Sequence, residues 1–129
     1  MSKTLDPEVF DLAAKISSKS WCRGVMRDDS GNFCAVGALV EAMRELDLGV
    51  GSKPFRHDGD ITEKAARAVK PYAFQVAKAV HPVLMESGFT SREPEWAHLI
   101  EWNDAYASKK DAATKFRAAA RKIRKEQSK

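Results

Sequence analysis

The stretch GNFCAVGAL, residues 31–39, joins a turn to the start of an apolar segment, and it decides the fold we expect. Gly31 follows a run of small polar residues, which is typical of a turn. From Cys34 onward the apolar side chains recur every three or four residues. This spacing predicts a helix that ends near Leu48, just before Gly49. Cys34 therefore lies where a turn meets a helix.

The residues before this turn have the composition of a β-strand. Residues 21–27 begin with Trp21 and contain further β-favouring side chains, and residues 32–35 follow the turn. Two such segments around a polar turn predict a short β-hairpin near residues 21–35. A compact loop is the alternative.

The other segments have helical spacing. We expect a first helix from Pro7, capped by Asp6, to about Ser20. A long helix should begin at a cap formed by Asp60 and Glu63, with a kink or split at Pro71 and a break at His81-Pro82. We expect a short helix over residues 94–102, ended by Trp102-Asn103-Asp104, and a last helix from Ser108 onward. The predicted fold class is mainly α (α+β), a single small domain over residues 1–129 with about five helices and one short hairpin. Residues 121–129 are expected to form a frayed basic tail.

The composition is that of a soluble globular protein. Of the 129 residues, 43% are hydrophobic and 31% are charged. The N-terminal segment lacks the apolar run of a signal peptide, and no segment has the length of a membrane span, so we expect a cytoplasmic protein without membrane contact. Cys22 and Cys34 cannot form a multi-bridge framework and match no zinc spacing, so we expect no cofactor and no metal. The sequence does not indicate an oligomeric state.

The positive charge is concentrated at the C-terminus. Residues 1–108 carry a net charge of −3, whereas residues 109–129 carry +7. Such a segment can attract phosphates, which makes nucleic acid a possible partner; a solvated helix face is the alternative interpretation. The cations that would bind nucleic acid are Lys115, Arg117, Arg121, Lys122, Arg124 and Lys125.

Three motifs resemble a known family. They read W-C-R-G at residues 21–24, D-x-x-G-x-x-C-A-x-G-A-L over residues 28–39 and W-N-D at residues 102–104. In this order they resemble a family of small uncharacterised proteins from bacteriophages, prophages and some bacterial genomes. The resemblance implies a small accessory protein, in the host cytoplasm if phage-encoded, and no known activity. Its signature residues here are Trp21, Gly24, Gly31, Cys34, Gly37, Ala38, Leu39, Trp102, Asn103 and Asp104. The basic C-terminal helix departs from the family pattern.

Two signature residues could carry chemistry. Cys34 at a helix start could be a nucleophile, but no histidine is spaced to serve as its base, and its apolar neighbours favour a buried structural role. Asp104 could act as a general base or ligand, whereas Asn103 and Asp104 together could simply end a helix. We therefore assign no catalytic residue.

These observations favour a binding role. The expected function is an accessory protein that binds a macromolecule, in the first place a host or phage protein that it inhibits or modulates. The alternatives are non-specific nucleic-acid binding through residues 109–129 and a small enzyme that depends on Cys34 or Asp104.

Overall fold

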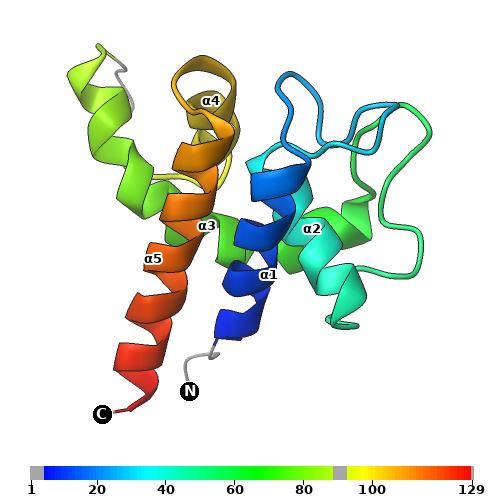
Figure 1. Cartoon of the computed structure of the whole chain (residues 1–129), viewed down its shortest axis with the longest axis horizontal. Helices are drawn as coiled ribbons and strands as arrows, with labels where there is room; N and C mark the ends of the chain where they lie inside the picture. The colour runs from blue at the N-terminus through cyan, green and yellow to red at the C-terminus, as the bar shows by residue number, and fades with distance from the viewer. Residues whose placement is uncertain (1–4, 89–92, 129) are drawn as a thin grey trace.

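The computed structural model describes residues 5–88 and 93–128, which are mainly helical (Figure 1). These residues form five helices: α1 (Pro7–Lys19), α2 (Ala35–Glu45), α3 (Glu63–Glu86), α4 (His98–Ala105) and α5 (Lys109–Gln127). The prediction of a mainly helical protein with about five helices is confirmed.

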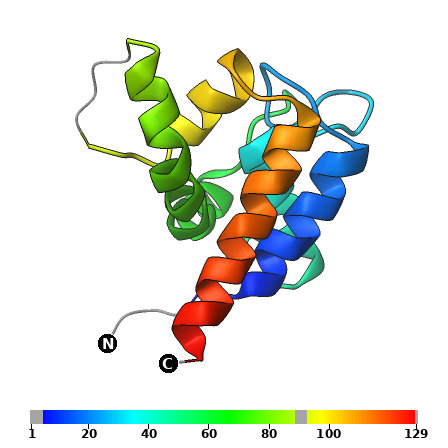
Figure 2. The ribbon, with the colours of Figure 1, turned by 60° about the vertical axis from the view of Figure 1, so that its left-hand side comes forward.

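The first and last helices lie side by side and run in opposite directions (Figures 1 and 2). Gln127 near the end of α5 donates to the carbonyl of Leu5, at 2.9 Å, and Arg124 pairs with Asp11 of α1. Small side chains on α5 allow this close approach, because Ala113 and Ala120 are buried between larger apolar residues.

All five helices contribute to the apolar core. Five of the largest completely buried side chains are one from each helix: Phe10, Leu39, Leu84, Leu99 and Phe116. Each such side chain contributes about 1.5–3 kcal/mol of transfer free energy when it leaves water. The short helix α4 is therefore fixed to the same core as the long helices, which matters because it carries the W-N-D motif.

The helix caps agree with the sequence at three ends. Asp6 accepts from the amide of Glu8 at the start of α1, and Ser108 forms a reciprocal capping box with Asp111 at the start of α5. Cys34 is the N-cap residue of α2. The cap of α3 was predicted wrongly: this helix begins after Thr62 and not after Asp60, and the hydroxyl of Thr62 accepts from the amide of Ala65.

The structure does not show the β-hairpin expected near residues 21–35. This segment is a loop with isolated bridges, in which Phe33 pairs with both Trp21 and Arg27. Some backbone groups bond across the turn, such as the amide of Cys34 to the carbonyl of Met26 at 3.1 Å, but two paired strands do not form because other polar groups bond elsewhere. The amide of Arg27 donates to the carbonyl of Gly59, at 3.0 Å, and the carbonyl of Cys22 accepts from the side chain of Asn103.

Two further boundaries differ from expectation. Helix α3 continues through Pro71 and Pro82, so the expected split at Pro71 and break at His81-Pro82 do not occur, whereas the alternative of a kink at Pro71 is compatible with one helix. Both prolines lie on the exposed side of α3, where freed carbonyls can turn toward water. Helix α4 extends to Ala105, so Asn103 and Asp104 lie inside the helix and do not end it. Their side chains bond to the loop over residues 21–35 and not to the end of their own helix.

In the part of the chain that the structure describes, none of the helices combines the length and the apolar character required to cross a membrane.

Candidate functional site

The signature residues from distant parts of the sequence meet at Asn103. This side chain is completely buried, with 0% of its surface exposed. Its Oδ1 accepts from the indole N–H of Trp21, at 2.7 Å, and from the amide of Ala35, at 3.0 Å. Its Nδ2 donates to the carbonyl of Cys22 and to Oδ1 of Asp104, each at 3.1 Å. Asn103 therefore uses both donors and both acceptor positions to hold the loop against the start of α2.

Asp104 extends this network to the next part of the loop. Its Oδ1 also accepts from the backbone amide of Gly24, at 3.0 Å. Gly24 has a φ of +86°, a conformation that glycine adopts without steric cost. Arg23 reaches in the other direction, donates to the carbonyl of Ala107 and lies over the ring of Trp21. The loop is thus tied to α4 and to the residues that follow it.

The polar turn in the loop is closed by a carboxylate. Oδ1 of Asp28 accepts from the amides of Ser30 and Asn32, at 3.0 and 2.8 Å, and Oδ2 accepts from the side chain of Asn32. The bonds from Asn32 lower the pKa of Asp28, because they stabilise its charged form. Gly31 allows this turn with a φ of +81°. Gly31 does not line the cavity described below, whereas the signature residues Gly24, Cys34 and Asp104 do.

Two glycines allow the chain to pack around residues 25–27. A Cβ on Gly37 of α2 would lie 1.9 Å from the carbonyl oxygen of Met26. A Cβ on Gly59 would lie 2.5 Å from the carbonyl oxygen of Arg27. Both contacts are with backbone, so a larger side chain would force the loop away. Residues 25–27 are therefore held between the start of α2 and the loop around Gly59.

Cys34 is buried and structural in this arrangement. It is 2% exposed, its Sγ accepts from the amide of Gly37 at 3.4 Å, and the sulfur of Met26 lies 3.5 Å from it. Burial raises the pKa of the Cys34 thiol to about 12. The thiol therefore keeps its proton at neutral pH and is a poor nucleophile.

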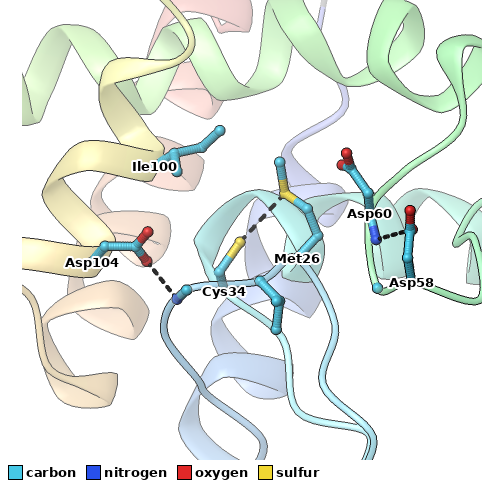
Figure 3. A pocket seen from close by; sticks show the side chains of 9 residues that line it. Met26, Cys34, Asp58, Asp60, Ile100 and Asp104 are labelled. Carbon is cyan, nitrogen blue, oxygen red and sulfur yellow. Dashed lines mark hydrogen bonds between the residues drawn. The ribbon is translucent and has the colours of Figure 1, made fainter.

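A cavity of about 330 Å³ opens where these elements meet (Figure 3). Asp104 lies on one side of the Cys34 and Met26 sulfur atoms, and Asp58 and Asp60 lie on the other. The lining residues are Gly24, Val25, Met26, Cys34, Asp58, Gly59, Asp60, Ile100 and Asp104. This set contains three carboxylates and no lysine, arginine or histidine. We refer to it as the acidic pocket.

The three carboxylates of the acidic pocket differ in their existing partners. Asp58 pairs with Arg56 at 3.1 Å and accepts from the amide of Asp60. Asp60 accepts from the amide of Ile61 at 2.7 Å. Oδ1 of Asp104 accepts from the amide of Gly24 and from Nδ2 of Asn103, and its Oδ2 accepts no hydrogen bond from the described residues. The pocket can therefore offer carboxylate oxygens to a cationic group. Within the described residues, no three His, Cys, Asp or Glu side chains are grouped to hold a metal ion.

The structure brings together only some of the residues singled out in the sequence. Trp21, Gly24, Asn103 and Asp104 form one hydrogen-bond network, and Cys34 lines the same pocket as Gly24 and Asp104. Trp102 is buried in the core. Sequence reasoning missed the other six residues that line the pocket: Val25, Met26, Asp58, Gly59, Asp60 and Ile100. The run DGD over residues 58–60 indicated a loop, but no sequence signal placed that loop beside residues 25–27.

The basic residues of α5 that the sequence singled out have three kinds of surroundings. Arg124 pairs with Asp11 and Arg117 donates to Ser18, so both lie toward α1. Lys115 and Lys122 instead line a groove beside α3, and Arg121 and Lys125 are exposed. Arg117 and Arg124 are therefore engaged with α1, whereas Lys115 and Lys122 lie beside α3.

Comparison with known proteins places the chain in a family. The sequence model described as "Family of unknown function (DUF6197)" matches residues 1–122. No curated protein and no solved structure matches the chain. The resemblance to an uncharacterised family is confirmed to that extent. The chain thus belongs to DUF6197, a family of unknown function.

Proposed function

We propose that this protein acts by binding another protein, which inserts a lysine or arginine side chain into the acidic pocket. The phage-type origin that the motifs resemble is part of this proposal and would make the partner a host or a phage protein. The observation that carries the proposal is the lining of the pocket. It contains three carboxylates and several apolar side chains, and none of the lining residues is basic.

The chemistry of the pocket suits both parts of a basic side chain. Val25, Met26 and Ile100 offer apolar contacts for an aliphatic stem. Asp60 and Asp104 offer oxygens for the charged end. Lysine and arginine combine such a stem with a cation at its tip. The cavity of about 330 Å³ is at the lower end of the range for ligand pockets, about 300–1,000 Å³.

The rigidity of the loop favours binding. The contacts from Asn103, Asp104 and Gly59 fix residues 22–27 before a partner arrives. A pre-formed surface loses less conformational entropy on association, so more of the contact energy appears as affinity.

The test is selection from a random peptide library displayed against the immobilised full chain. We expect enriched peptides that contain lysine or arginine next to an apolar residue. Their affinity should fall at least tenfold, about 1.4 kcal/mol, for D58N/D60N, because the substitution removes two charges and keeps the hydrogen-bond acceptors. The matched control is D47N/E86Q, which removes two exposed charges outside the pocket and should bind unchanged.

Two results would overturn the proposal. One is a selection in which no peptide is enriched over the uncoated support. The other is a set of peptides that bind D58N/D60N as tightly as the unchanged protein while both proteins give the same circular dichroism spectrum.

A further inference from the structure

A second surface, away from the residues of the acidic pocket, combines cations with aromatic rings. It consists of two hollows beside the exposed face of α3. The first has a volume of about 630 Å³, and its lining includes Arg67, Lys70, Phe74 and Trp96. The second has a volume of about 160 Å³ and lies between α3 and α5, with Lys78, Lys115 and Lys122 in its lining. We refer to the two together as the α3 surface.

Cation–ring contacts connect the two hollows. The Nζ of Lys70 lies 5.7 Å from the ring centre of Trp96. The Nζ of Lys78, which belongs to the second hollow, lies 5.3 Å from the ring centre of Phe74, which belongs to the first. Phe74 is 38% exposed, which is unusual for a phenylalanine in a small protein. The ring of Phe74 is therefore exposed to solvent, the ring of Trp96 is half-buried, and each ring has a cation beside it.

The charge of the α3 surface is strongly positive. Five cations line it, two from the first hollow and three from the second. The opposing carboxylates are Glu95, which lines the first hollow, and Glu63, which pairs with Arg67 at 2.9 Å. Both partners of that pair are well exposed, so it is weak. Lys70, Lys78, Lys115 and Lys122 remain as attractors of anions.

We propose that the α3 surface binds single-stranded nucleic acid without sequence preference. Phosphates would contact the lysines of the second hollow, and bases would stack on Phe74 and Trp96. Proteins that bind single strands combine a cationic track with aromatic rings in this way, because every base has a flat face to stack. A duplex buries those faces, so it could use only the cations. The sequence predicted Lys115 and Lys122 as nucleic-acid contacts but did not place them beside these rings, because the rings and lysines come from three separate segments.

The first experiment measures fluorescence anisotropy of a labelled 20-residue oligothymidylate with the full chain. We expect binding at 50 mM salt that weakens steeply as salt is added, and weaker binding of a duplex of equal length. The variant K78Q/K115Q/K122Q should reduce the slope of log affinity against log salt by about 2, since single strands give about 0.7 per cation. The control K109Q/K110Q/K125Q removes three exposed charges of α5 outside the hollows and should leave the slope nearly unchanged.

The second experiment separates base stacking from simple charge attraction. F74L keeps an apolar side chain and loses the ring, and it should weaken oligothymidylate binding about tenfold, within the range measured for stacked bases. F74Y keeps a ring and should retain the affinity. Polyglutamate of similar length should compete poorly, because it offers charge without bases.

Several outcomes would overturn the proposal. The first is an absence of oligothymidylate binding at 50 mM salt. The second and third are a fall of the salt slope in the control triple variant as large as in K78Q/K115Q/K122Q, and unchanged oligothymidylate binding by F74L. The others are duplex binding as tight as single-strand binding and full competition by polyglutamate. The last result would identify a general site for acidic polymers. The variant D58N/D60N should bind the oligonucleotide normally, so this proposal and the protein-binding proposal fail separately.

Discussion

The indole N–H of Trp21 donates to Oδ1 of Asn103 across 2.7 Å, although 82 residues separate them in the sequence. The same oxygen accepts from the amide of Ala35, which is the first residue of α2. One buried amide group thus fixes the beginning of the loop, its end and the start of the next helix. This relationship gives the W-C-R-G and W-N-D motifs a common structural reason.

Replacement of Asn103 by alanine should destabilise the protein strongly. The change leaves the buried amide of Ala35 and the partly buried indole N–H of Trp21 and carbonyl of Cys22 without this partner. A buried polar group without a partner costs about 1–3 kcal/mol. We expect a loss of about 3–5 kcal/mol in the free energy of unfolding, measured by urea denaturation. N32A is the control, since it removes one bond at a partly exposed turn and should cost about 1 kcal/mol or less. A loss below that value for N103A would contradict the role assigned to it.

Alanine at position 37 should also destabilise, although alanine is normally the better helix former by about 1 kcal/mol. The reason is the Cβ position 1.9 Å from the carbonyl oxygen of Met26, a backbone atom that can move only with the loop. We expect G37A to lose about 2 kcal/mol or more. T114A, at an exposed position of α5, should gain a few tenths of a kcal/mol, about the difference in helix propensity. Stability of G37A equal to or above the unchanged protein would show that the loop does not pack on α2 as described.

The two cysteines should differ in their rates of alkylation. Cys34 is 2% exposed and its pKa is raised to about 12, so its thiolate is about a thousandfold scarcer at pH 8 than that of an ordinary thiol. Cys22 is only partly buried, and burial raises its pKa as well. Mass spectrometry of iodoacetamide-treated protein should show slow modification of Cys22 in the folded C34S variant and hardly any modification of Cys34 in the folded C22S variant. Both cysteines should be modified rapidly in urea. Rapid labelling of folded C22S would contradict the burial of Cys34.

The stability contribution of Cys34 should depend on pH in one direction. Its pKa lies at about 12 in the folded protein, compared with an ordinary value of 9.0. Between these values the unfolded chain releases the proton and the folded chain retains it, so rising pH favours unfolding. The difference in unfolding free energy between the unchanged protein and C34S should be constant below pH 9. Above pH 9 it should fall by up to about 1.4 kcal/mol per pH unit, measured by urea denaturation; a flat or rising difference would contradict the prediction.

The sequence predicted most of the helices because their signals are local. Asp6 with Pro7, and Ser108 with Asp111, mark helix starts through bonds that span only a few residues. The start of α3 was misplaced by two residues because Asp60 and Thr62 can both cap, and only the backbone geometry selects Thr62. Local signals in the sequence therefore predict that a helix is present more accurately than they predict the residues at which it begins and ends.

The expected hairpin and the incomplete pocket have a different cause. Residues 21–35 have β-favouring composition, but Asn103 and Gly59 offer their backbone other partners, and neither is near in sequence. The same long-range placement brings Asp58 and Asp60 beside Met26. Hydrophobic periodicity and turn composition carry no information on such pairings. Cys34 was assigned correctly to a buried structural position because its immediate neighbours are apolar.

The hydrogen bonds of Asn103 also have a consequence for the order of folding. They join segments that are 68 to 82 residues apart, so the chain must close very long loops before any of them can form. Such closures are entropically costly and come after local helix formation. We expect the helices to collapse first and the acidic pocket to be completed last, when α4 docks. Protein that has just been synthesised would then be compact before it becomes competent to bind.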